Sequence, residues 1–293
     1  MRKWIKRIGL IFGAFGLLIA VFLSYAYFIE PRRFVVIEET IEVPNWDPRL
    51  NGLRVLTIAD MHTGSNYAPP ERIQYVVEQA NAQQPDIIVL LGDYVSESKW
   101  DREALKGPEG TDRTELKVPV ETIASILGGL RAKYGVFAII GNHDWYHNEE
   151  KIARQFREAG LDVLQNEIRE IAVNDATLRI WGIEDLWRNR IVPVEPYNAL
   201  DEKRNIIAIT HNPDSLFHAP DEVSIMFAGH THGGQLNWPI VGPLAVFNDP
   251  LFMDGLAEVE GKYVYVSSGV GTSVLPLRFR VPPEINVITL VSK

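Results

Sequence analysis

Five short apolar runs in this chain each end in a cluster of polar residues. The runs are five to seven residues long and rich in valine, isoleucine and leucine, which is typical of buried strands. Between the early runs, apolar residues recur at helical spacing, as at Ile73, Val76, Val77 and Ala80. Parallel strands need such a crossover between them, so the alternation predicts an α/β fold with largely parallel early strands. The five runs span residues 53–59, 87–91, 136–140, 206–210 and 224–228.

Further apolar runs later in the chain indicate a second sheet. They span residues 178–183, 263–266 and 285–291, and the runs at 206–210 and 224–228 belong to the same predicted sheet. Residues 34–43 suggest an additional edge strand, and 119–132 a further helix. The polar segment 96–117 predicts a surface insertion, either a solvated loop or a substrate lid.

The polar clusters contain the residue types that bind metals through nitrogen and oxygen. Loops at the carboxyl ends of strands assemble the sites of open α/β sheets, so these side chains are expected to converge. Five of the seven histidines lie in the clusters, whereas His147 and His218 are predicted to be ordinary surface or helix residues. No cysteine occurs, which excludes thiolate sites and disulfides. The candidate residues are Asp60, His62, Asp93, Asn142, His143, Asp144, His211, His230 and His232.

The order of these motifs resembles that of the calcineurin-like metallophosphoesterases. The resemblance rests on Asp60-x-His62, Gly92-Asp93, Gly141-Asn142-His143-Asp144, His211 and Gly229-His230-x-His232. It implies a two-sheet α/β sandwich flanked by helices. The glycine-rich stretch at 269–273, the residues that follow it and an N-terminal apolar segment are similar to the membrane-attached branch, which includes UDP-2,3-diacylglucosamine pyrophosphatases and broad phosphodiesterases.

The resemblance also implies two divalent metal ions, of manganese, iron or zinc, bridged by Asp93. Asp60, His62 and His232 would complete one metal site, and Asn142, His211 and His230 the other. Such a pair activates water for in-line attack on phosphorus. His143 would assist the leaving oxygen as a general acid. Asp144 would orient His143, or it would act only as a turn or cap residue.

Two arginines near the C-terminus are candidates for substrate contacts. Guanidinium groups make paired hydrogen bonds to phosphate oxygens, so Arg278 and Arg280 are either phosphate ligands or surface residues. Leu275, Leu277 and Phe279 alternate with them, which indicates a half-buried strand or, alternatively, contacts with acyl chains.

The charge distribution argues against a nucleic acid as partner. The formal net charge is −9, and four basic residues precede the first acidic one. Without those four, 25 basic residues face 38 acidic ones, a balance of about −13. Nucleic-acid binding relies on a basic surface, whereas a phosphate-containing small molecule or lipid remains compatible with this charge.

An uncharged segment near the N-terminus predicts a transmembrane helix. The 22 residues from Ile8 to Ile29 would span roughly 30 Å at about 1.5 Å each, which matches the hydrocarbon core of a bilayer. A cleaved signal peptide is the alternative, but its apolar region is usually shorter. Basic residues before the segment outnumber those that follow closely, which favours a single-pass protein with the catalytic domain outside the cytoplasm.

These observations predict three regions and one reaction class. Residues 1–29 form a membrane anchor, 30–52 a linker and edge strand, and 53–293 the metallophosphoesterase domain. The expected activity is cleavage of a phosphodiester or pyrophosphate bond in a membrane-associated substrate, with UDP-2,3-diacylglucosamine as one candidate. The alternative enzyme is a broad phosphodiesterase or phosphatase that acts on soluble or wall-derived phosphates. A non-catalytic membrane scaffold is the alternative that is not an enzyme.

Overall fold

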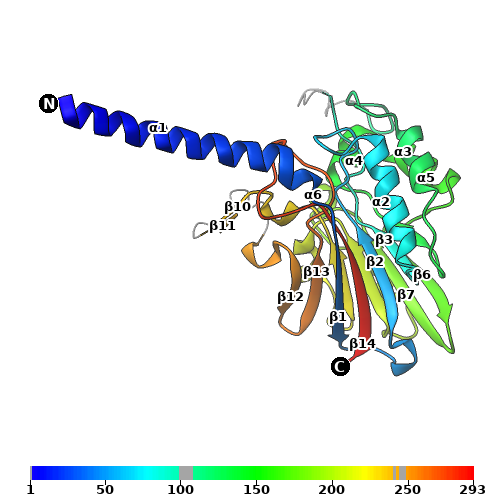
Figure 1. Ribbon diagram of the computed structural model, residues 1–293. Helices are drawn as coiled ribbons and strands as arrows, with labels where there is room; N and C mark the ends of the chain where they lie inside the picture. Colours follow the sequence, from blue (N-terminus) through cyan, green and yellow to red (C-terminus); the bar gives the residue numbers. More distant parts are fainter. Residues whose placement is uncertain (1, 99–107, 240–241, 244–248) are drawn as a thin grey trace.

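Two six-stranded sheets form the body of the protein (Figure 1). The computed structural model describes residues 2–98, 108–239, 242–243 and 249–293. The first sheet has the order β1 (Val35–Val43), β14 (Glu284–Ser292), β2 (Leu53–Ile58), β3 (Ile87–Leu90), β4 (Val136–Ala138) and β5 (Asp162–Val163). The second has the order β12 (Gly255–Val259), β13 (Lys262–Val266), β9 (Ile225–Ala228), β8 (Ile206–Thr210), β7 (Ala176–Ile183) and β6 (Glu167–Val173).

Each sheet contains a block of parallel strands. In the first sheet β2 to β5 are parallel, and in the second β7, β8, β9 and β13 are parallel. The antiparallel pairs are β14 with β2, β12 with β13 and β6 with β7. The prediction of largely parallel early strands is therefore confirmed. The assignment of residues 285–291 to the second sheet is wrong, because β14 pairs with β2 in the first sheet and carries the edge strand β1 on its other side.

The core is layered because both faces of the central strands are buried. Along β2, Val55 points into the layer between the sheets, whereas Leu56 points toward the helices. The layer between the sheets also contains Val89 from the first sheet and Ile209 from the second. Two covered faces explain why these strands read as continuous apolar runs and not as alternating ones.

Helices cover the outer face of the first sheet. These are α2 (Pro70–Ala82), α3 (Val120–Leu127) and α5 (Glu149–Glu158), with the short α4 (Asn142–His147) at the end of β4 (Figure 1). The second sheet is covered by the 3-10 helix Pro213–His218 and by α7 (Glu195–Asn198), while α6 (Leu186–Asn189) follows β7. The predicted two-sheet α/β sandwich flanked by helices is confirmed.

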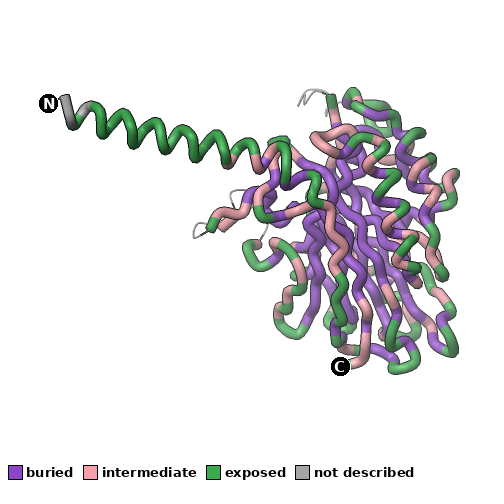
Figure 2. Tube along the Cα trace, in the orientation of Figure 1, coloured by how far each residue is buried: buried purple, intermediate pink, exposed green. Residues whose placement is uncertain are grey.

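A long exposed helix precedes the sandwich. Helix α1 (Arg2–Ser24) continues as a π-helical turn (Tyr25–Ile29) and projects away from the body (Figures 1 and 2). The stretch Lys6–Arg32 is long and apolar enough to cross a membrane. Its last turns contact the body: the ring of Phe22 lies 4.6 Å from that of Trp238 and 4.8 Å from that of Phe279.

The strand expected around Leu275, Leu277 and Phe279 does not form. Residues 269–283 form a loop in which the β-type pairing is limited to one isolated bridge, between Leu236 and Phe279. The alternating pattern has another cause here, because Phe279 packs against α1 while Leu275 is exposed. We call residues 269–283 the glycine loop.

Candidate functional site

All five polar clusters meet at one edge of the sandwich. They follow the carboxyl ends of β2, β3 and β4 in the first sheet and of β8 and β9 in the second. Parallel strands point their carboxyl ends the same way, so residues far apart in sequence converge there. Two groups of neighbouring ligand-type side chains result, and a third set, His62, Asp93 and His143, overlaps both of them.

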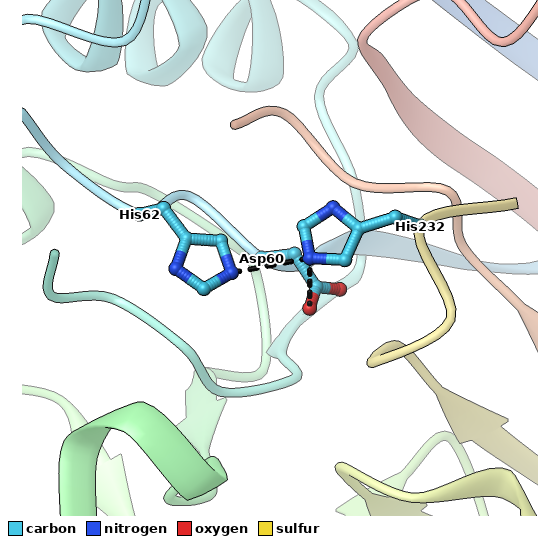
Figure 3. A group of neighbouring side chains, drawn as sticks. All are labelled: Asp60, His62 and His232. Carbon is cyan, nitrogen blue, oxygen red and sulfur yellow. Dashed lines mark hydrogen bonds and ion pairs between the residues drawn. The ribbon is translucent and has the colours of Figure 1, made fainter. Parts of the chain in front are cut away.

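The first group consists of Asp60, His62 and His232 (Figure 3). The Nε2 atoms of the two histidines lie 3.1 Å apart, and Nε2 of His232 lies 3.4 Å from Oδ1 of Asp60. All three side chains are buried. Asp60 and His62 lie in the loop after β2, and His232 lies in the loop after β9. This group therefore combines residues from both sheets.

The second group consists of Asp93, His211 and His230, with Asn142 beside them. Nε2 of His211 lies 3.0 Å from Oδ1 of Asn142 and 3.0 Å from Nδ1 of His230. The Nδ1 atom of His211 donates to the backbone oxygen of Leu91 at 2.8 Å. This contact fixes the ring so that Nε2 of His211 faces Asn142 and Asp93.

Asp93, which belongs to the second group, also faces the first group. Its Oδ2 atom is 3.5 Å from Nε2 of His62 and 3.3 Å from Nε2 of His211. The backbone amide of His143 donates to the other oxygen, Oδ1, at 2.8 Å. One carboxylate oxygen thus faces histidines of both groups, which is the geometry that a bridging ligand requires.

The backbone is strained at five of these residues. Asp60, His62, Asp93, His230 and His232 have φ values of 49°, 40°, 56°, 72° and 53°. Residues other than glycine rarely adopt this left-handed backbone conformation, and such strain concentrates at functional sites. The strained turns aim successive side chains of one loop into a single site.

Two glycines allow the loops after β3 and β4 to touch. A Cβ atom on Gly141 would lie 2.4 Å from the backbone nitrogen of Asp93 and 2.4 Å from its Oδ1. One on Gly92 would lie 2.6 Å from the nitrogen of Gly141, and Gly92 has a φ of +87°. A larger residue at Gly141 would displace the carboxylate of Asp93, and one at Gly92 would push the loop at Gly141 away.

Burial favours the neutral form of three of the histidines, which suits metal binding. Burial lowers the pKa of His62 to about 4 and holds the pKa values of His230 and His232 well below the usual range. Metal ligands must be neutral imidazoles, so this environment keeps their nitrogens available. Burial also raises the pKa of the Asp60 carboxyl, since an isolated buried charge is unfavourable.

These residues fit two divalent metal ions. Nitrogen and carboxylate oxygen donors suit manganese, iron and zinc, and both groups offer such donors within 4.8 Å of one another. Nitrogen atoms facing each other at 3.0–3.1 Å beside buried carboxylates are stabilised by a cation that all of them can ligate.

Glu97 is a site residue that the sequence did not reveal. Its carboxylate oxygens lie 3.0 and 3.1 Å from Nδ1 of His143, and its side chain is buried. The ring of His143 packs edge-to-face on that of His62 at 4.8 Å. Glu97 lies in the segment expected to be a surface insertion, of which residues 99–107 are outside the described part of the chain.

Asp144 acts as a cap in this structure. Its two carboxylate oxygens accept the backbone N–H groups of Asp93 at 2.8 Å, Tyr94 at 2.9 Å and Gly141 at 2.9 Å. Of the two roles left open for Asp144, these contacts favour the structural one. It joins the loop after β3 to the start of α4, while Glu97 contacts the ring of His143.

Arg278 is neither a phosphate ligand at the surface nor a surface residue. Its side chain is 0% exposed, and its guanidinium donates to the backbone oxygens of Ser268, Gly269, Gly271 and Val281. It holds the glycine loop together, and Gly271 in turn donates to the backbone oxygen of Asp60 at 2.7 Å. Arg280, by contrast, is exposed.

The two remaining histidines differ in their surroundings. His218 is exposed, as expected. His147 is the last residue of α4 but is buried, with Nδ1 2.9 Å from the backbone oxygen of Thr114. This contact attaches the end of the insertion to α4. His147 lies outside the two metal-ligand groups.

Comparison with known proteins identifies the family. The family model described as calcineurin-like phosphoesterase matches residues 53–234. The chain is 30% identical to the phosphodiesterase YaeI of Escherichia coli, over 92% of each protein. It is 28% identical to the uncharacterized metallophosphoesterase YkuE of Bacillus subtilis, over 100% of this chain and 99% of that protein.

A relative with a membrane segment is also similar. The transmembrane protein with metallophosphoesterase domain from Danio rerio is 28% identical over 89% of this chain and 58% of its own length. Members of the matched family use two divalent metal ions, and both groups of ligand-type residues lie in the matched region. The chain belongs to the calcineurin-like phosphoesterases, and it is a metal-dependent phosphoester hydrolase.

Proposed function

We propose that the protein hydrolyses a phosphodiester or pyrophosphate bond in a membrane-associated substrate. The observation that carries this proposal is Asp93, which faces both groups of ligand-type side chains, with His143 beside them. Asp60, His62 and His232 hold one metal, and Asn142, His211 and His230 the other. Residues 53–293 form the catalytic domain, 30–52 the linker and edge strand, and 1–29 the anchor.

His143 supplies the proton for the leaving group. Burial by itself would lower its pKa, but Asp93 and the hydrogen bond with Glu97 raise the pKa of His143 to about 9. The ring is therefore protonated at neutral pH and donates a proton to the departing oxygen. Two bound divalent ions supply charge stabilisation and an activated water.

The position of α1 supports a membrane-associated substrate. The backbone nitrogen of Arg278 donates to the oxygen of Ala26 at 3.0 Å, which ties the glycine loop to the last turns of the apolar helix. At the tip of this loop Val274 is 90% exposed and Leu275 is 49% exposed. The same loop contacts Asp60 through Gly271, so the end of the helix and the metal ligands share one structural unit.

We propose that the catalytic domain lies outside the cytoplasm. Arg2, Lys3, Lys6 and Arg7 precede the apolar segment, and the positive-inside rule assigns that end to the cytoplasm. A C-terminal alkaline phosphatase fusion, which is active only when exported, tests this placement together with protease treatment of intact cells. An inactive fusion and a protected domain would contradict it and would favour UDP-2,3-diacylglucosamine as substrate.

The activity itself is tested with a chromogenic phosphodiester and added Mn²⁺. Hydrolysis that is lost with a chelator and restored by Mn²⁺ is the expected result. Metal binding without turnover of any phosphodiester or pyrophosphate would instead identify a scaffold. Lipid extraction from the purified protein tests the membrane-associated substrate, since a broad enzyme for soluble phosphates would carry no enriched phospholipid.

A further inference from the structure

A cavity of about 470 Å³ lies beside the metal ligands and has aromatic walls. It is lined by Trp145, Tyr146, Leu186, Trp187 and Arg190. Its volume is within the range of small-molecule sites, roughly 300–1,000 Å³. Trp145 and Tyr146 belong to α4, whereas the other three lie in or directly after α6, so the cavity is formed by two helices that follow strands of different sheets.

Two walls of this cavity contact the reaction site directly. The ring of Trp187 packs edge-to-face on that of His230, with centroids 4.4 Å apart. The ring of Tyr146 lies 5.7 Å from that of His143 in a similar arrangement. A phosphate held by the metal ligands would therefore have its organic group at the mouth of the cavity.

The aromatic walls are held in place by a shared carboxylate. The indole N–H of Trp145 donates to Oδ2 of Asp185 at 3.1 Å, and the backbone N–H of Trp187 donates to Oδ1 of Asp185 at 3.3 Å. Asp185 is buried, and Arg188 forms ion pairs with Glu149 and Glu184 that attach α6 to its neighbours. The cavity is thus preorganised, which lowers the entropic cost of binding.

The chemistry of the lining selects a flat ring. Trp187 is 41% exposed despite its large apolar surface, and aromatic faces stack on planar rings whatever their substituents. Leu186 is the one aliphatic residue among the lining side chains. Arg190 adds a positive charge at the rim, which suits a ring attached to phosphate.

We propose that this aromatic cavity binds a planar aromatic ring in the organic group of the substrate, either a nucleobase or another aryl group. The inference rests on the proposed function, because the phosphate at the metal ligands positions the ring. Since Tyr146 contacts His143, the ring belongs to the group that leaves. Hydrolysis breaks the phosphorus–oxygen bond to that group, water provides the new oxygen on phosphorus, and His143 gives the leaving oxygen its proton.

Equilibrium binding tests the cavity without turnover. The full-length protein in detergent, loaded with Mn²⁺, is titrated by calorimetry with methyl phosphate, phenyl phosphate and uridine monophosphate. A stacked ring contributes ~1–3 kcal/mol, so the aromatic ligands are expected to bind about tenfold more tightly than methyl phosphate. Preference for uridine monophosphate over phenyl phosphate identifies a nucleobase, and equal affinity identifies a general aryl site.

Matched variants connect the preference to the cavity. Trp187→Leu should bring the ratio of the affinities for aromatic ligands and methyl phosphate to about one, and Trp187→Phe should retain the preference for the aromatic ligands. Phe217→Leu removes another exposed aromatic side chain, away from the cavity, and should change nothing. Equal affinity of the unmodified protein for all three ligands would overturn the inference, even if the chromogenic phosphodiester is hydrolysed. Absence of hydrolysis with the aromatic preference intact would contradict the proposed function alone.

Discussion

The carboxylate of Glu97 lies 3.0 Å from Nδ1 of His143, and the backbone amide of His143 donates to Oδ1 of Asp93 at 2.8 Å. This pair joins the segment after β3 to the start of α4. The carboxylate fixes the ring and, with Asp93, raises the pKa of His143. Both effects keep the proton where a leaving oxygen can take it.

Glu97→Gln is therefore expected to change the pH profile of the reaction. The amide keeps the shape but loses the charge, so the pKa of His143 falls and the protonated acid is lost at lower pH. The alkaline limb of kcat should move to lower pH, with a larger loss of activity at pH 9 than at pH 6. Glu115→Gln, at an exposed position in the same segment, serves as control. An equal loss at every pH would show that Glu97 acts only on structure.

His143→Ala should slow turnover and leave the metals bound. A positioned general acid contributes about 10²–10⁴ in rate, so kcat should fall by that factor. Metal content, measured by inductively coupled plasma mass spectrometry, should match that of the unmodified protein. A loss of one metal equivalent would make His143 a ligand instead.

Asp93→Asn should abolish activity and reduce metal content. A neutral amide is a poor bridge between two cations, and the Oδ2 atom of Asp93 faces histidines of both groups. Asp201→Asn, at an exposed carboxylate, controls for the change of charge. If the Asp93 variant retains two metals and near-normal turnover, Asp93 is not the bridge.

Arg278→Met should destabilise the fold through the glycine loop. The substitution removes the donor of four backbone oxygens in the interior. Gly269 keeps the N–H of Glu284, but Ser268, Gly271 and Val281 lose their donor, and each buried unpaired group costs about 1–3 kcal/mol. The melting temperature should fall by at least roughly 5 °C. Arg280→Met changes an exposed neighbour and should leave the melting temperature nearly unchanged. Equal melting temperatures for both variants would refute the structural role.

The sequence alone determined the strands that precede the site and the ligand-type residues that follow them. Each predicted ligand directly follows a buried parallel strand, and the carboxyl ends of such strands meet at one edge. Position along the chain therefore specifies position in the site for Asp60, Asp93 and His211. The apolar N-terminal helix could also be predicted from the sequence, because its length and lack of charge are properties of one continuous segment.

Only the tertiary structure decided which residues support that site. Glu97 lies in a polar segment without periodicity, so no local pattern separates it from a solvated loop. Arg278 looks like a surface arginine until the glycine loop closes around its guanidinium. The aromatic cavity lies between α4 and α6, and these two helices come together only because the two sheets stack. Long-range packing determines burial and charge environment, and these properties assign the roles that residue types and spacing leave open.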